Sequence, residues 1–493
     1  MASPLRSTFV SSLTARPRAW IDRLWLAVAE RGRAHVEVPE KTLVPLERAR
    51  QLATALLSER GEASGAAVAR ELHAVLGDLG HDERLGFYRF VAAGFLPDER
   101  RLRAAAEAYL AQPSAERAAQ LAEAAEPSRQ ELLRRMNLSP GGTAALVGMR
   151  KDVLGQLRRE PALKPLDSDL RHLFASWFNR GFLDLRRIDW ETPAAVLEKL
   201  IEYEAVHEVQ GWDDLRRRLG PDRRCFAFFH PSLPGEPLIF VEVALVEGLA
   251  AAVQPLLARD RDDKAQRERT ARADTAIFYS ISNCQGGLRG VSFGNFLIKQ
   301  VVEELKAELP HLARFSTLSP VPTFRRWLEQ RAAAAEAEDL LHPEESAALR
   351  AAGGAGAAAD PAALLLTLLR REDWWEDPEV AEALRRPLLR LCALYLTSSA
   401  GGAGPADPVA RFHLGNGARL ERINWLGNVA PRGITESFGL MVNYLYDPEA
   451  IETNHEAFVR DGAVVRSPAI DALLAPPPPP AGAARPRSAA RGR

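Results

Sequence analysis

A glycine-rich segment is the strongest chemical signal in the sequence. It spans residues 283–295, follows a β-branched and aromatic run that predicts a strand, and precedes a run that predicts a helix over 293–309. Glycine lets a backbone approach a ligand closely, and the start of a helix presents unpaired N–H groups and a positive dipole end. The segment could therefore hold an anion such as a pyrophosphate. A tight turn without a ligand fits the pattern equally well, because such turns are common.

Three further side chains could take part in acid–base or nucleophilic chemistry. Ser319 precedes Pro320 at the end of a predicted strand, and no Gly-x-Ser-x-Gly elbow surrounds it. His413 has apolar neighbours and precedes an Asn-Gly pair, which predicts a strand edge or a hairpin. His230 ends a predicted strand, where it could serve packing or a site. Taken singly, Ser319 and His413 are more typical of structural residues than of catalytic ones.

Two polar pairs stand inside apolar runs, Asn424-Trp425 and Asn443-Tyr444. Buried amides and phenols need hydrogen-bond partners, so these residues either support a site or tie strands together. No HExxH, Walker A, Rossmann, flavin or pyridoxal motif is present. An enzyme of this sequence would work with side chains and backbone dipoles alone, and we expect neither a metal nor an organic cofactor.

Composition limits the class of protein. The 493 residues carry 64 basic and 65 acidic side chains, and a net charge of −1 gives no reason to expect a nucleic-acid or membrane partner. No uncharged apolar run approaches the roughly 18–20 residues that a bilayer requires. The three cysteines are far apart in the sequence, which argues against a disulfide framework and favours a reducing compartment. We therefore expect a soluble globular protein of two or three domains.

The periodicity of the sequence changes part-way along the chain. Apolar residues recur with helical spacing over about 42–210, which predicts a bundle of antiparallel helices. From about residue 223, short β-branched and aromatic runs alternate with helical ones, which predicts an α+β or α/β domain. We thus predict a helical domain over 41–212 for scaffolding or oligomerisation. A mixed domain follows over 213–474, with a helical insertion at about 323–400.

The two ends of the sequence differ from the rest. The first residues are rich in Arg and Ser and poor in acids, which is typical of a transit peptide or of a solvated arm. We favour a flexible arm over 1–40 and a cytoplasmic protein, with the mitochondrial matrix as the alternative. Residues 475–493 are rich in Pro, Ala and Arg, and we expect a disordered tail.

Several of these segments together resemble the malonyl-CoA decarboxylase family, and they occur in the family's order. The resemblance covers roughly residues 42–474. The segments that carry it are FHPSLPGEPLIFVEVAL (229–245), FYSIS (278–282), GVSFGNFLIK (290–299), FSTLSPVP (315–322), RFHL (411–414), RINW (422–425), RGIT (432–435) and GLMVNY (439–444).

The resemblance implies a fold, a substrate and a site. The fold is an N-terminal helical bundle followed by a catalytic domain like the GNAT-type N-acetyltransferases. The acetyltransferase signature that holds CoA pyrophosphate falls on the glycine-rich segment, with Ser292 where glycine is usual. The catalytic serine falls on Ser319 and the catalytic histidine on His413. The residues implied to bind malonyl-CoA, besides these two, are Arg289, Gly290, Val291, Ser292, Phe293, Gly294 and Asn295.

The implied reaction converts malonyl-CoA to acetyl-CoA and CO2 through a thioester enolate. Our hypothesis is that His413 donates a proton or hydrogen bond to the enolate, while Ser319 engages the malonyl carboxylate. Two alternatives stay open, an N-acyltransferase that uses the same CoA loop and a catalytically silent acyl-CoA-binding scaffold. A homo-oligomer formed through the helical domain is the expected assembly.

Overall fold

The computed structural model describes residues 44–58, 62–258, 260, 262–291, 297–333, 340–354, 360–398 and 405–475. It divides into two compact units. The first consists of the chain up to Arg186 together with Phe228–Ile239 and Asn283–Gly294, and the second consists of the remaining segments.

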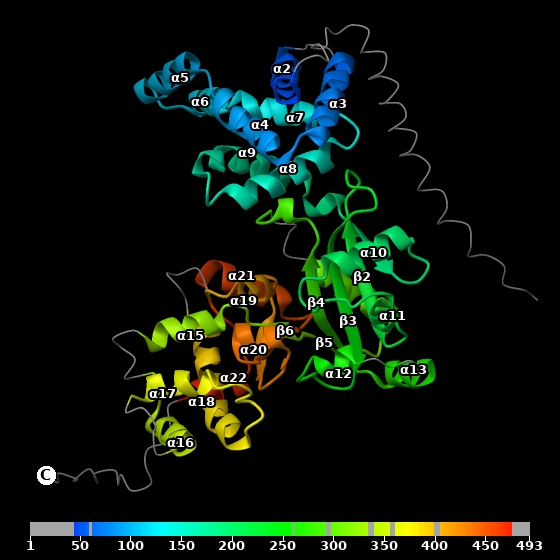
Figure 1. Cartoon of the computed structure of the whole chain (residues 1–493), viewed down its shortest axis with the longest axis vertical. Coiled ribbons are helices and arrows are strands. Elements are labelled where there is room, and N and C mark those ends of the chain that lie inside the picture. The colour runs from blue at the N-terminus through cyan, green and yellow to red at the C-terminus, as the bar shows by residue number, and fades with distance from the viewer. Residues whose placement is uncertain are drawn as a thin grey trace, which may run out of the picture. The chain divides into compact units, whose positions relative to one another are not determined.

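Helices build the N-terminal part of the first unit (Figure 1). Their apolar residues recur at helical spacing; in α2, for example, Ala49, Leu52, Ala53 and Leu56 are buried. Asp98 and Ser114 cap α5 and α6 by accepting backbone N–H bonds. These elements are α2 (Pro45–Ser58), α3 (Glu62–Asp78), α4 (His81–Gly94), α5 (Glu99–Ala111), α6 (Ala115–Ala125), α7 (Ser128–Met136), α8 (Gly142–Gln156), η2 (Pro161–Leu163), α9 (Lys164–Trp177) and η3 (Arg180–Phe182).

A mixed eight-stranded sheet is the centre of the fold that follows, with strand order β1-β2-β3-β4-β5-β8-β6 and β7 paired to β8. β4 and β5 are parallel, whereas β8 runs antiparallel to β5, β6 and β7. The strands are β1 (Asp184–Ile188), β2 (Arg223–Phe229), β3 (Pro237–Val246), β4 (Thr275–Asn283), β5 (Arg314–Thr317), β6 (Ser319–Pro320), β7 (Arg419–Asn424) and β8 (Met441–Tyr446).

The sheet's central strands are apolar and almost fully buried, which is typical of strands covered on both faces. One core cluster joins β3, β4 and β8 through Ala244, Ile277 and Met441. The remaining helices are α10 (Ala194–Tyr203), α11 (Trp212–Arg218), α12 (Gln254–Leu257), α13 (Asp263–Arg272), α14 (Leu297–Glu308), α15 (Phe324–Ala332), α16 (Pro343–Gly353), α17 (Pro361–Leu369), α18 (Pro378–Thr397), α19 (Pro408–Gly415), α20 (Pro431–Ser437), α21 (Ile451–Asp461) and α22 (Pro468–Leu474), and a short 3₁₀ turn, η4, spans Gly286–Leu288.

The predicted order of a helical region followed by a mixed sheet is confirmed. Helices α15–α18 gather into one group between β6 and β7 in the sequence, where the helical insertion was predicted (Figure 1). One prediction is wrong: residues 184–188 form strand β1 inside the stretch that we assigned to helices. β1 is held by pairing at the edge of β2, a long-range interaction that local periodicity does not show. None of the described helices is both long and apolar enough to cross a bilayer.

Candidate active site

Ser319 and His413 face one another in the second unit. The Ser319 Oγ lies 3.0 Å from the Nε2 of His413, although 94 residues separate the two along the chain. Both side chains are almost completely buried, with exposed fractions of 6% and 2%. β6 positions the serine, because Ser319 pairs with Val442 of β8. The structure therefore brings together the two residues that the family resemblance singled out.

His413 lies on a helix, so the predicted strand edge or hairpin is wrong. α19 begins after Asp407, whose carboxylate accepts N–H bonds from Val409 (2.9 Å) and Ala410 (3.0 Å), and Pro408 occupies its first turn. An Asp cap followed by proline is a strong signal for the start of a helix. The Asn-Gly pair that suggested a hairpin instead ends this helix, with Gly417 at a φ of 81°.

Two tyrosines of β8 fix the ring of His413. The Tyr446 hydroxyl is 2.8 Å from Nδ1, and the Tyr444 ring stacks on the imidazole with centroids 4.7 Å apart. Sequence reasoning noted Tyr444 but missed Tyr446. The sequence contained a signal for Tyr446, because it lies two residues after Tyr444 and residues two apart on a strand point to the same face.

Burial sets the protonation states of this site. It lowers the pKa of His413 to about 3 and raises the pKa of Tyr446 well above its ordinary value. At neutral pH the imidazole is therefore uncharged and the phenol keeps its proton. When the phenol donates to Nδ1, the imidazole proton sits on Nε2 and faces Ser319.

The depressed pKa of His413 predicts a pH dependence of stability. In the unfolded chain this imidazole takes up a proton below pH 6.5, whereas in the folded protein it stays neutral until about pH 3. The stabilisation is therefore complete above pH 6.5 and is lost as the pH falls towards 3. Between pH 7 and 5, the unfolding free energy of the wild type should fall by about 2 kcal/mol relative to that of His413→Asn. Urea unfolding of both proteins at the two pH values measures this difference, and equal changes in both would contradict the assignment.

Asp407 connects the helix that carries His413 to the start of α15. Besides capping α19, its carboxylate accepts a hydrogen bond from the Thr323 hydroxyl at 2.9 Å, and the residue is fully buried. Asp407→Ala should cost about 1–2 kcal/mol for the lost cap, and it should lower kcat because His413 is then less firmly held. Ser114→Ala is the matched control, since it removes the cap of α6 in the first unit. Thermal unfolding and steady-state kinetics test both variants, and an unchanged kcat in Asp407→Ala would contradict the positioning role.

The two polar pairs noted in the sequence tie strands together beside the site. Asn443 donates to the Thr317 carbonyl at 2.6 Å and accepts a hydrogen bond from the Asn424 amide at 2.9 Å. The Tyr444 N–H donates to the Thr317 hydroxyl at 3.1 Å. These bonds fix β8 against the residues that lead into Ser319.

β4 and β5 separate next to the serine. Their register ends at Phe278 and Thr317, and the chain then turns so that Ser319 pairs with β8 instead. β4 itself continues to Asn283. Among the described residues, β4 beyond Phe278 is thus no longer in register with β5.

Part of the predicted CoA loop lies in the first unit. The exposed Arg289 and Gly290 follow η4, and Gly290 adopts a φ of 76°, where an added Cβ would have no atom of the described residues within 4 Å. Val291 is buried. The other implied binding residues, Ser292, Phe293, Gly294 and Asn295, lie outside the described residues, as does the predicted helix start at 293. The helix itself is described as α14, from Leu297.

Two family models cover most of the chain. The malonyl-CoA decarboxylase N-terminal domain matches residues 95–178, and the malonyl-CoA decarboxylase C-terminal domain matches residues 181–483. The chain belongs to the malonyl-CoA decarboxylase family.

Solved and curated members of the malonyl-CoA decarboxylase family are similar over long stretches. The crystal structure of malonyl-CoA decarboxylase from Rhodopseudomonas palustris is 49% identical with a TM-score of 0.78, covering 87% of this chain and 99% of that one. The Agrobacterium vitis structure is 48% identical with a TM-score of 0.77, covering 87% and 100%. The mitochondrial enzyme of the goose Anser anser anser is 37% identical over 338 residues, which are 68% of this chain and 66% of the goose protein.

His230, the other histidine singled out by sequence, belongs to the first unit. Its ring packs against Phe178 and Phe182, with centroids 4.7 and 6.3 Å away, and its Nδ1 accepts the Ser232 N–H at 3.1 Å. These contacts are those of a packed core residue, which is the simpler of the two interpretations that the sequence left open.

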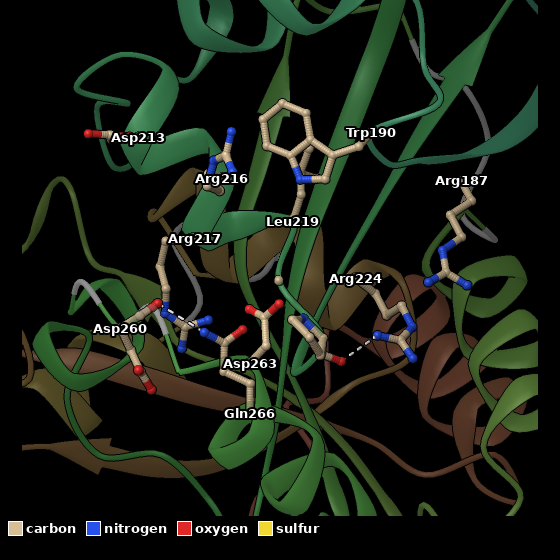
Figure 2. A pocket seen from close by; sticks show the side chains of 12 residues that line it. Arg187, Trp190, Asp213, Arg216, Arg217, Leu219, Arg224, Asp260, Asp263 and Gln266 are labelled. Carbon is tan, nitrogen blue, oxygen red and sulfur yellow. Dashed lines mark hydrogen bonds between the residues drawn. The ribbon is translucent and has the colours of Figure 1, made fainter.

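An arginine-lined cavity of about 600 Å³ lies elsewhere in the second unit (Figure 2). Arg224 is held by Glu308 at 2.7 Å, and Arg187 shares the same carboxylate. Arg216 lies over the Trp190 ring, 5.3 Å from its centroid. Since most of these guanidinium groups are already partnered, the cavity offers little free positive charge to an anionic substrate.

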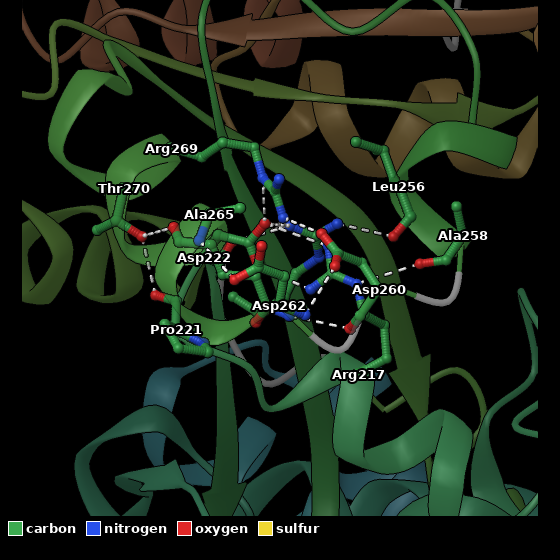
Figure 3. Close-up of polar contacts among 12 residues, drawn as sticks. Arg217, Pro221, Asp222, Leu256, Ala258, Asp260, Asp262, Ala265, Arg269 and Thr270 are labelled. Atoms are coloured by element: carbon green, nitrogen blue, oxygen red, sulfur yellow. Dashed lines mark hydrogen bonds and ion pairs between the residues drawn. The ribbon is translucent and has the colours of Figure 1, made fainter.

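A buried carboxylate neutralises the arginines next to this cavity (Figure 3). Asp222 accepts hydrogen bonds from Arg217 at 2.6 Å and from Arg269 at 3.0 Å, and Arg269 also pairs with Asp260 at 2.5 Å. Burial alone would raise the pKa of Asp222, but the bond from Arg217 and the neighbouring positive charges lower it. The network holds β2 and α13 together and has the character of a structural element.

Proposed function

We propose that this chain decarboxylates malonyl-CoA to acetyl-CoA and CO2, acting as a carboxy-lyase. The observation that carries the proposal is the buried contact between Ser319 Oγ and His413 Nε2, in a chain that belongs to the malonyl-CoA decarboxylase family.

Ser319 and His413 act at opposite ends of the malonyl group, the serine at the carboxylate and the histidine at the thioester. The Ser319 hydroxyl donates a hydrogen bond to the malonyl carboxylate and orients it for departure. As the bond between C2 and the carboxylate breaks, its electron pair moves towards the thioester and forms an enolate. The Nε2–H of His413 donates a hydrogen bond to the thioester oxygen and stabilises this charge. A preorganised donor of this kind contributes roughly 3–4 kcal/mol in other enzymes.

A proton must then reach C2 of the enolate. The Nε2 proton of His413 is suited to this step, and the Tyr446 hydroxyl can replace it at Nδ1 through the existing 2.8 Å hydrogen bond. After product release a proton from solvent returns to Nε2 and the Nδ1 proton returns to the Tyr446 oxygen, which restores the starting tautomer, so one proton is consumed for each CO2 released. The apolar surroundings of the pair, with Leu318 and Phe315 buried, favour loss of the solvated carboxylate as neutral CO2.

We further propose how the rest of the substrate is held. Arg289 to Asn295 bind the pyrophosphate of CoA, and the amides of the pantetheine arm pair with the edge of β4 beyond Phe278. Arg289 supports this role because its side chain is exposed and makes no ion pair with the described residues.

Incubation of the purified chain with malonyl-CoA, without an acceptor, tests the function. The proposal predicts equal amounts of acetyl-CoA and CO2. Reaction only after an amine is added would indicate an N-acyltransferase, and CoA binding without turnover would indicate a silent scaffold.

The domain limits, the assembly and the compartment are further proposals. We place the helical domain at 41–212 and the catalytic domain at 213–474, and we propose a homo-oligomer formed through the helices. Light scattering on the purified protein tests the oligomer. We propose the cytoplasm as the compartment, with the mitochondrial matrix as the alternative in view of the relatives named as mitochondrial.

A further inference from the structure

A buried arginine of the first unit lies directly beneath the predicted CoA loop. Arg150 of α8 is 1% exposed, and no part of the catalytic proposal uses it. Its Nη1 donates to the carbonyl oxygens of Gly287 at 2.7 Å and Arg289 at 2.9 Å. Its Nε donates to the Asp167 carboxylate at 2.8 Å, which fixes the guanidinium from the other side.

The hydrogen bonds from Arg150 to the Gly287 and Arg289 carbonyls set the orientation of the loop's peptide groups. In a trans peptide the C=O and the following N–H point in opposite directions. Because the Arg289 carbonyl points to Arg150, the Gly290 N–H points away from it. This N–H makes no hydrogen bond to the described residues, and a Cβ at Gly290 would meet none of their atoms within 4 Å. Arg150 thus turns carbonyl oxygens inward and leaves an N–H donor at the surface.

The loop also rests closely on the backbone of α8. A Cβ at Gly287 would lie 1.9 Å from the carbonyl oxygen of Val147, so only glycine fits at this position. The exposed side chain of Arg289 is on the solvent side, while its carbonyl is held from below. Because Asp167 neutralises the buried guanidinium, the role of Arg150 is to hold the two carbonyl oxygens.

We propose that Arg150 is a positioning residue for binding the CoA diphosphate: it fixes the peptide planes of residues 287–290 so that the loop presents the Gly290 N–H to the phosphates. The inference rests on the proposed function of this loop. It assigns to a helical residue, distant in sequence from the catalytic pair, a share in substrate affinity.

Two thioesters separate this role from a general effect on folding. Malonyl-CoA and malonyl-pantetheine carry the same reacting group, but only the first carries the phosphates. Arg150→Lys keeps the charge beside Asp167 but cannot hold both carbonyls in the fork geometry of a guanidinium. We expect kcat/KM for malonyl-CoA to fall tenfold or more, chiefly through KM, while kcat/KM for malonyl-pantetheine changes less than twofold.

The matched control is Arg129→Lys. Arg129 is also buried in the first unit and pairs with Asp169, but it donates to the Ala92 carbonyl and not to the loop. It should leave the preference for malonyl-CoA over malonyl-pantetheine unchanged. If Arg150→Lys lowered kcat/KM by the same factor for both thioesters, or lowered it for neither, the positioning role would be overturned.

The outcome for the wild type separates this inference from the proposed function. A wild-type protein that decarboxylates neither thioester would contradict the function itself. A wild-type protein that uses both equally well would contradict phosphate binding by the loop, and with it the role of Arg150.

Discussion

Replacement of His413 by asparagine should lower kcat for malonyl-CoA decarboxylation by about 10²–10⁴-fold. The variant loses the ring that stacks on Tyr444 and bonds to Tyr446, and with it the N–H proposed to serve the enolate. Ser319→Ala should also cause a large loss, because the malonyl carboxylate then lacks its hydrogen-bond donor. The rate of CO2 release at saturating malonyl-CoA measures both effects.

His230→Asn is the control for this experiment. His230 is a buried histidine as well, but it packs between aromatic rings of the first unit. Its replacement should lower stability and leave kcat close to that of the wild type. If His413→Asn or Ser319→Ala kept near wild-type kcat with a folded circular dichroism spectrum, the catalytic assignment would be wrong.

Gly287→Ala should cause the second large effect, on substrate affinity. Its new methyl group would lie 1.9 Å from the Val147 carbonyl oxygen and 3.0 Å from the Val147 side chain. Backbone cannot yield as a flexible side chain does, so the loop must lift from α8 and lose its bonds to Arg150. We expect KM for malonyl-CoA to rise more than tenfold, together with a stability loss of about 1–3 kcal/mol from overpacking.

The neighbouring glycine provides the control for Gly287. A Cβ at Gly286 would meet only the Lys151 side chain, at an ordinary 3.5 Å, and Gly286 does not have a positive φ. Gly286→Ala should therefore keep KM within about twofold of the wild type. Similar KM values for the two alanine variants would show that the fit of the loop on α8 does not matter for substrate binding.

The sequence predicted which residues form the candidate site better than it predicted their local structure. Ser319 and His413 could be singled out only through the family resemblance, since 94 residues separate them and each is ordinary in its local context. The helix under His413 was predictable from Asp407-Pro408, but the Asn-Gly pair after it was given more weight. Tyr446 was predictable from its alternation with Tyr444 once β8 was assigned.

Other features had no local signal at all. Arg150 lies 137 residues from Gly287, and nothing in either segment indicates that a side chain of a helix holds the loop. β1 likewise depends on a neighbouring strand and not on its own periodicity. Periodicity predicts which face of an element is buried, but pairing between distant elements is decided by the fold as a whole.

Strand β8 contacts most of the residues of the candidate active site. It aligns Ser319 through Val442, supports the imidazole through two tyrosines, and pairs with β5, β6 and β7. Amide hydrogens of Met441–Tyr446 should accordingly be among the slowest to exchange with deuterium. A single opening of this strand would separate Ser319 from His413, so loss of the proposed activity in mild denaturant should follow the same cooperative transition as exchange at β8.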